Sequence, residues 1–145
     1  MGNQRPGVRL ILLVEDNPDD ILFARRAFAK VCPEVRLISA QDGEVAIDYL
    51  AGNGEFQDRT RHPLPELILL DLKLPRRSGL EVLEWLRQES EMRGLAVVVL
   101  TSSEETRDVE RAKSLGIMAY YVKPVTNAAF METARSICRE WLNSS

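Results

Sequence analysis

Cysteine, glycine and proline are all scarce in this chain of 145 residues, which contains 2 Cys, 8 Gly and 7 Pro. The two cysteines, Cys32 and Cys138, lie far apart and provide neither a disulfide framework nor the four ligands of a structural zinc site. We therefore expect both to be reduced thiols in a hydrophobic core. The low glycine and proline content, together with 45% hydrophobic residues, excludes a fibrous repeat or a disordered chain.

Long apolar runs and an excess of basic residues are also missing. The longest apolar runs, residues 10–14 and 95–100, are far shorter than the roughly 20 residues of a membrane helix, and the N-terminus lacks the apolar stretch of a signal peptide. The 19 Lys and Arg against 22 Asp and Glu give a net charge of -3, whereas nonspecific nucleic-acid binding draws on a basic excess. We expect a cytoplasmic protein that binds neither membranes nor nucleic acid directly.

What the chain does contain is a regular alternation of short apolar runs and longer amphipathic stretches. The runs predict five strands, at residues 10–14, 35–38, 67–71, 96–101 and 118–123. Strands that alternate with helices form parallel sheets covered by helices on both faces. We expect a three-layer α/β fold with strand order 2-1-3-4-5, in one domain of residues 10–145 after an N-terminal extension of residues 1–9, because a domain has roughly 100 to 200 residues.

Two of the predicted helices have informative sequences. The first starts at Asn17, a favoured N-cap, and has acids in its first turn, where they interact with the helix dipole. The fourth, residues 104–115, is mostly charged and has only Val109, Ala112 and Leu115 as a thin apolar stripe. This fourth helix should therefore pack weakly.

Polar residues stand where four of the predicted strands end. Glu15 and Asp16 follow the first strand, and Asp71, Thr101 and Lys123 end the third, fourth and fifth. The carboxyl ends of parallel strands meet at one edge of the sheet, where ligands bind in such folds. Each residue alone has a structural explanation, such as a turn acid or a solvated lysine. Folding does not require all five at one edge, so the set favours a functional site.

The chemistry of this set points to phosphoryl transfer. Clustered carboxylates repel one another unless a cation joins them, and Mg²⁺ prefers oxygen ligands and takes one or two protein carboxylates. A carboxylate such as Asp71 can act as a nucleophile toward phosphorus. The Thr101 hydroxyl, the Lys123 ammonium and the metal would then stabilise the charge that spreads over the phosphoryl oxygens.

These motifs together resemble the receiver domains of response regulators in two-component signalling, whose CheY-like members have a flavodoxin-like fold with this strand order. The resemblance covers residues 10–142. It is carried by the acids Glu15 and Asp16 after a buried strand, Asp71 with Pro75 and Gly79 following it, Thr101 with Ser102, and Lys123 with Pro124.

The resemblance implies a role for each site residue. Asp71 is the phosphoacceptor, and Asp16, Asp71 and the backbone carbonyl of Lys73 are ligands of Mg²⁺, with Glu15 completing the acidic pocket. Thr101 contacts the phosphoryl group.

The resemblance also implies how the signal is passed on. Lys123 contacts the phosphoryl group, Tyr120 occupies an aromatic switch position, and the peptide bond between Lys123 and Pro124 is cis. The domain promotes its own phosphorylation and dephosphorylation and is a signalling phosphoacceptor, not a conventional enzyme.

The partner implied by the family is a sensor histidine kinase. The opening Val-Glu-Asp-Asn-Pro-Asp-Asp at residues 14–20 and the long polar loop at residues 53–65 resemble single-domain receivers that partner phytochrome-type kinases. Lys73 departs from the common pattern, because many receivers have a neutral or polar residue two positions after the phosphoacceptor. Its ammonium could hinder the approach of water to a phosphoryl group. His62, the only histidine, is expected to be exposed and without a phosphotransfer role.

Self-association is a further expectation. With no output domain to occupy it, the face formed by residues 104–115, the fifth strand and the terminal helix is expected to form a homodimer when the domain is phosphorylated. The apolar residues offered for this contact are Met118, Tyr121, Trp141 and Leu142.

Three other functions compete with this interpretation. A haloacid-dehalogenase-type phosphatase needs a second acid two residues after its nucleophile, where Lys73 stands. A flavodoxin-like electron carrier needs a phosphate-binding loop after the first strand, where residues 15–20 are rich in acids. A degenerate receiver that serves as a phosphorylation-independent docking module remains the alternative.

Overall fold

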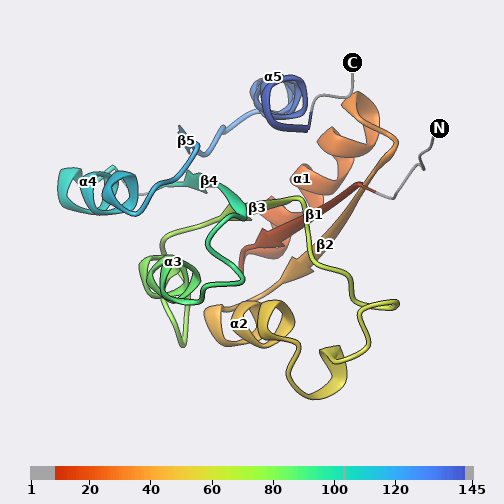
Figure 1. Cartoon of the computed structure of the whole chain (residues 1–145). Helices are drawn as coiled ribbons and strands as arrows, with labels where there is room; N and C mark the ends of the chain where they lie inside the picture. Colours follow the sequence, from red (N-terminus) through yellow and green to blue (C-terminus); the bar gives the residue numbers. More distant parts are fainter. Residues whose placement is uncertain (1–8, 103, 143–145) are drawn as a thin grey trace.

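A computed structural model describes residues 9–102 and 104–142 of the chain (Figure 1). The strands are β1 (Arg9–Val14), β2 (Val35–Ala40), β3 (Leu67–Leu70), β4 (Ala96–Thr101) and β5 (Ala119–Val122). The helices are α1 (Pro18–Val31), α2 (Gly43–Ala51), α3 (Gly79–Gln88), α4 (Thr106–Ser114) and α5 (Asn127–Ile137), followed by a π-helical turn, Cys138–Leu142. All five predicted strands are present, with ends that differ from the prediction by at most two residues.

The five strands form one parallel sheet in the order β2-β1-β3-β4-β5, which confirms the predicted topology. Helices α1 and α5 cover one face, and α2, α3 and α4 cover the other (Figure 1). Alternate residues of β1 enter the two cores: Ile11 and Leu13 pack under α1 and α5, and Leu12 and Val14 pack under the opposite layer. This double burial explains why the strand is apolar throughout.

Helix α1 begins where the sequence predicts. The side-chain oxygen of Asn17 accepts hydrogen bonds from the backbone N–H groups of Asp19 and Asp20, at 2.8 and 3.2 Å. These bonds satisfy two of the free donors at the start of the helix. The cap therefore fixes where α1 starts, directly after the acids that follow β1.

Helix α4 packs weakly, as its sequence predicts, since Ala112 is its one buried residue. Its C-terminal end is nevertheless held by Arg87 of α3, whose guanidinium donates to the carbonyls of Leu115 and Gly116 at 2.6 and 3.2 Å. The N-cap residue of α4, Glu105, makes no capping hydrogen bond with its side chain. The two ends of α4 are thus held very differently.

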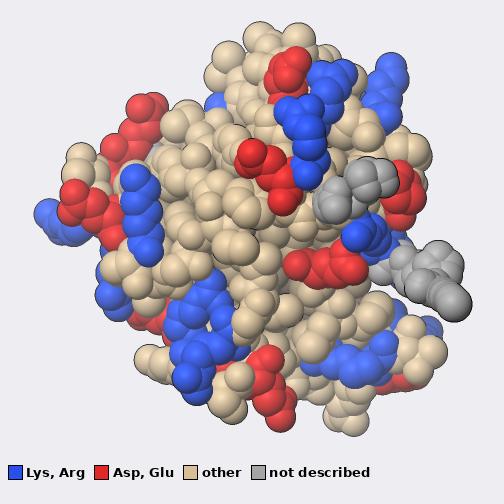
Figure 2. All heavy atoms as spheres, turned by 45° about the horizontal axis from the view of Figure 1, so that its top comes forward, with Lys and Arg blue, Asp and Glu red and all other residues tan. Residues whose placement is uncertain are grey.

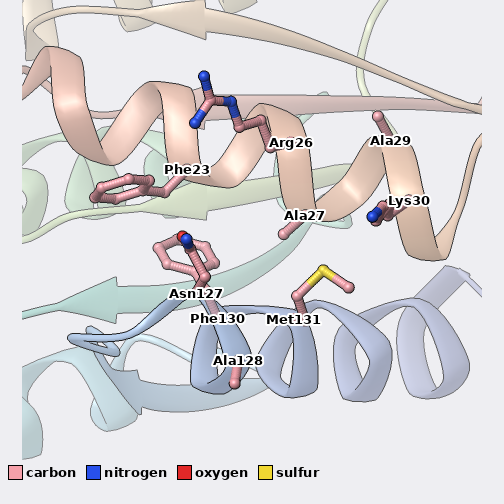
Figure 3. Close-up of a pocket in the computed structure, with 9 residues that line it drawn as sticks. All are labelled: Phe23, Arg26, Ala27, Ala29, Lys30, Asn127, Ala128, Phe130 and Met131. Atoms are coloured by element: carbon pink, nitrogen blue, oxygen red, sulfur yellow. The ribbon is translucent and has the colours of Figure 1, made fainter.

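An open apolar groove of about 560 Å³ runs along the line where α1 and α5 meet (Figure 3). Its lining includes Phe23 and Ala27 of α1 and Met131 of α5, with Arg26 and Lys30 on the α1 side. On the face that Figure 2 shows, acidic and basic side chains are interspersed.

Two predictions about single residues have different outcomes. Cys32 and Cys138 are both buried free thiols, as expected. His62, expected to be exposed, is half-buried, because its ring packs edge-on against Phe56 and Tyr49 at centroid distances of 5.2 and 6.0 Å. The loop that carries it contains a 3-10 turn, Gly54–Phe56, whose aromatic ring supplies this packing.

None of the helices described is long and apolar enough to span a bilayer.

Candidate functional site

The predicted site residues meet at the carboxyl edge of the sheet. The register pairs Val14 with Leu70, Leu70 with Val99, and Thr101 with Val122. The strands therefore end side by side, and the residues that follow β1, β3 and β5 lie along the same edge of the sheet as Thr101, the last residue of β4.

Asp71 lies at the centre of this edge and is only 3% exposed. Its Oδ1 accepts hydrogen bonds from the Thr101 hydroxyl at 2.6 Å and from the backbone N–H of Lys73 at 3.1 Å. Its Oδ2 lies 3.0 Å from the Lys123 ammonium. Both oxygens of a buried carboxylate are thus held by donors, which fixes the direction in which the carboxylate points.

Gly79, the first residue of α3, is needed for this geometry. A side-chain Cβ at this position would overlap the carbonyl oxygen of Asp71 and lie 2.6 Å from the Cα of Leu72. The N–H of Gly79 donates to the Leu72 carbonyl at 3.0 Å. The absence of a side chain therefore lets the start of α3 approach the backbone that carries the central aspartate.

Lys123 contacts more acids than the sequence predicts. Its ammonium lies 2.8 Å from Glu15 Oε1, 2.8 Å from Asp20 Oδ2 and 3.0 Å from Asp71 Oδ2. Burial by itself would lower the pKa of Lys123, but the bonds to Asp20 and Glu15 and the charge of Asp71 raise the pKa above its ordinary value. The ammonium is therefore charged at any pH at which the protein works.

Asp20 is the site residue that the sequence analysis missed. Its position in the first turn of α1 was explained by the helix dipole alone. A signal was present, because Asp20 lies in the first turn of α1, which begins at Pro18, directly after the acids that follow β1. A helix that starts at the sheet edge would therefore bring Asp20 back toward the acids after β1.

Glu15 is almost fully buried, with 3% of its surface exposed. Burial raises the pKa of this carboxyl, and the charge of Asp71 adds to the rise, while the bonds from Lys123 and from the backbone N–H of Asn17 oppose it. The N–H bond measures 3.0 Å to Oε2. The environment of Glu15 is therefore unfavourable to its negative charge unless a cation is near.

The acids also fit a divalent cation. One carboxylate oxygen each from Glu15, Asp16 and Asp71 lie within 4.8 Å of one another, and Asp16 is exposed to solvent. Two ligands on opposite sides of an octahedral Mg²⁺ are about 4.2 Å apart, and the ion keeps several waters. An all-oxygen donor set of this span, open to water on one side, matches that requirement.

Lys73 and Tyr120, two neighbouring residues to which the resemblance gave a role, lie on the side of the site that faces α4. The Lys73 ammonium lies 3.8 Å from Glu105 Oε1 at the start of α4, and its side chain is 58% exposed. Tyr120 is half-buried and packs against the core on the α4 side of the sheet. Burial raises its pKa, and the charges of Glu104, Asp108 and Asp71 raise it further. Tyr120 is thus within electrostatic reach both of the start of α4 and of Asp71.

The expected cis bond before Pro124 is not found, because no peptide bond among the described residues is cis. The trans form of such a bond is favoured by about 0.5–1 kcal/mol. Lys123 contacts its three carboxylates with the bond in the trans form.

Comparison with known proteins agrees with this geometry. The family model described as the response regulator receiver domain matches residues 11–135. Rcp1, a response regulator of Synechocystis sp., is 31% identical over 144 residues, which are 99% of this chain and 96% of Rcp1. The probable methanogenesis regulatory protein FilR2 of Methanothrix harundinacea is 35% identical over 133 residues, covering 92% of this chain and 83% of FilR2.

Solved structures show the same relationship. The phosphorylated cyanobacterial phytochrome response regulator RcpA superposes with a TM-score of 0.88 at 30% identity, over 96% of this chain and 97% of RcpA. A Mn²⁺-bound form of Rcp1 gives a TM-score of 0.85 at 32% identity, over 94% and 96% of the two chains. The strand order, the assembled acids and these matches lead to one conclusion: the chain belongs to the response regulator receiver domain family.

Proposed function

We propose that Asp71 accepts a phosphoryl group from a sensor histidine kinase in the cytoplasm and that the domain passes the signal on by changing conformation. The proposal rests on the burial and the hydrogen-bond partners of the Asp71 carboxylate. It is buried, its two oxygens are oriented by Thr101 and Lys123, and it lies beside Glu15 and Asp16. A nucleophile fixed in this way needs little reorganisation to attack phosphorus.

In the reaction, an Asp71 oxygen forms a bond to phosphorus and the bond from phosphorus to a histidine nitrogen of the kinase breaks. The nitrogen keeps the electron pair. Lys123 and Thr101 already donate to Asp71, so the same donors can pass to the oxygens of the incoming group and stabilise their charge. Mg²⁺, held by Asp16, Asp71 and the backbone carbonyl of Lys73 next to Glu15, would supply further positive charge.

The kinase partner is proposed from the relatives. RcpA is a phytochrome response regulator by its description, and this chain matches nearly all of RcpA. A phytochrome-type histidine kinase is therefore the first candidate. The alternative of a phosphorylation-independent docking module is not favoured, because every residue that phosphoryl transfer requires is present and assembled at one edge of the sheet.

The test is labelling with acetyl phosphate and Mg²⁺, read by intact mass spectrometry. The parent protein should gain one phosphoryl group and Asp71→Asn should gain none. Asp19→Asn is a matched control, because it removes an exposed carboxylate from the same edge of the sheet. Labelling of Asp71→Asn as strong as that of the parent would show that another residue is the acceptor.

We also propose that phosphorylation promotes a homodimer through α4, β5 and α5. Met118 and Val122 are 49% and 48% exposed on this face, and Tyr121 and Trp141 are half-buried. Leu142, expected as a contact, is 2% exposed and packs inside the core with α1 and α5. Its side chain is therefore not available for contact with a second copy.

Sedimentation with Mg²⁺, with and without beryllofluoride as the phosphoryl analogue, tests the dimer. We expect dimers only with the analogue, and Val122→Glu should prevent them by placing charge on the exposed edge strand. Identical monomeric profiles in both conditions would exclude dimerisation as the response.

A further inference from the structure

The ammonium of Lys123 has no free donor in this structure. A lysine has three N–H donors, and Lys123 Nζ lies 2.8 Å from Glu15 Oε1, 2.8 Å from Asp20 Oδ2 and 3.0 Å from Asp71 Oδ2. Each donor therefore has a carboxylate oxygen as its acceptor. A phosphoryl oxygen can bind this ammonium only by replacing one of the three carboxylates.

The three carboxylates are not equivalent. The side chains of Glu15 and Asp71 are each 4% exposed, while that of Asp20 is 24% exposed. Asp20 is also absent from the group whose oxygens lie within 4.8 Å of one another, which consists of Glu15, Asp16 and Asp71. Asp20 thus contacts the site through Lys123 and is not part of the acidic pocket.

Asp20 is not needed to start the helix either. The backbone N–H groups of Asp19 and Asp20 are capped by the side chain of Asn17. The Asp20 carboxylate instead accepts a hydrogen bond from Lys123, which lies 103 residues later in the chain. Its structural contribution can therefore be separated from its effect on Lys123.

Phosphorylation changes what each carboxylate does. The donor that reaches Asp71 Oδ2 can pass directly to a phosphoryl oxygen on the same residue. Asp20 keeps its hold on the ammonium, offsets part of its positive charge, and adds a negative charge close to an anionic group. Glu15 also contacts the ammonium, from the buried side, so removing the charge of Asp20 would leave the ammonium at the site but less strongly drawn toward α1.

From these contacts we infer that Asp20 is a positioning residue that holds the Lys123 ammonium toward α1 and thereby weakens the binding of a phosphoryl group at Asp71. The inference rests on the proposed function of Asp71. The first turn of α1 would thus influence how tightly the site binds a phosphoryl group.

The experiment is a calorimetric titration with beryllofluoride at saturating Mg²⁺, using the whole chain. Asp20→Asn keeps an oxygen acceptor for the ammonium but removes the charge, and should bind the analogue about fivefold more tightly, the upper range for one partly exposed charge pair. Asp20→Glu restores the charge and should bind close to the parent. Asp19→Asn makes the same change of net charge one residue away and should also match the parent.

The outcomes separate this inference from the proposed function. Equal affinities for Asp20→Asn and the parent, or weaker binding by Asp20→Asn, would overturn the role of Asp20. A gain shared by Asp19→Asn would overturn it too, because the effect would then be one of net charge. If the parent bound no analogue, or Asp71→Asn bound it equally well, the proposed function itself would fail. Circular dichroism melting of each variant confirms that it is folded.

Discussion

Replacing Lys123 by methionine removes the ammonium that contacts Glu15, Asp20 and Asp71 and leaves a site with negative charge only. The Lys123 side chain is 14% exposed and those of Glu15 and Asp71 are 4% exposed. Removing one partner of a buried ion pair costs about 3–5 kcal/mol. Because Asp20 is partly exposed and methionine keeps most of the side-chain volume, we expect a loss of about 3 kcal/mol in the free energy of unfolding.

The loss should depend on Mg²⁺ and on pH. The folded-state pKa of Lys123 is raised, so its contribution is fully present below the ordinary lysine pKa and is lost only as the pH rises through the folded pKa. In the variant, Glu15 loses the bond from Lys123 that opposes the rise of its pKa, so the stability of the variant relative to the parent should increase as the pH falls from 7 to 5. A cation at one hundred times its Kd adds about 2.7 kcal/mol, and the more negative variant should gain more from Mg²⁺ than the parent.

The assay is urea unfolding followed by circular dichroism, at pH 7 and pH 5, with EDTA or with Mg²⁺. Lys113→Met, on the exposed surface of α4, is the control for loss of a positive charge. If Lys123→Met unfolded at the same urea concentration as the parent in EDTA, or lost equal stability at both pH values, the electrostatic account of the site would be refuted.

Three further predictions concern the surroundings of the site. Glu15→Gln should be more stable than the parent at pH 7, because burial raises the pKa of Glu15 and its negative charge therefore destabilises the fold. Urea unfolding should show this difference disappearing below pH 4.5, the ordinary pKa of the group. Gly79→Ala should lose about 2–3 kcal/mol through backbone overlap, while Gly94→Ala, which meets nothing within 4 Å, should unfold near the parent. Lys73→Ala should change the dephosphorylation half-life less than about twofold, since an exposed ion pair contributes little. Glu105→Gln removes the partner of the Lys73 ammonium and should lengthen the half-life. Equal half-lives in the parent and both variants would show that Lys73 does not reach the phosphoryl group.

The sheet and most of the site could be predicted from the sequence for one physical reason. In a parallel sheet buried on both faces, each strand is a short apolar run, and the first polar residue after it marks the carboxyl edge. Asp71, Thr101 and Lys123 were placed together by this rule, and the structure joins them by direct contacts.

The remaining features depend on how elements pack against one another. Asp20 contacts Lys123 across 103 residues of sequence, because the Lys123 side chain extends along the edge of the sheet to the first turn of α1; the sequence places Asp20 near this edge but does not give its partner. His62 is half-buried because Phe56 and Tyr49 converge on it. Leu142 enters the core because the π-helical turn after α5 directs it inward. Each of these depends on tertiary packing that local sequence patterns do not encode.

The unequal anchoring of α4 has a mechanical consequence. Arg87 fastens its C-terminal end through the carbonyls of Leu115 and Gly116, so the helix has a fulcrum there. Its nine residues span about 13 Å, so a tilt of about 10° around that fulcrum moves the opposite end by about 2 Å. A small displacement next to Thr101 would therefore become a larger displacement of the end that carries Glu105, and would reorient the charged surface of α4 while the bonds from Arg87 are kept.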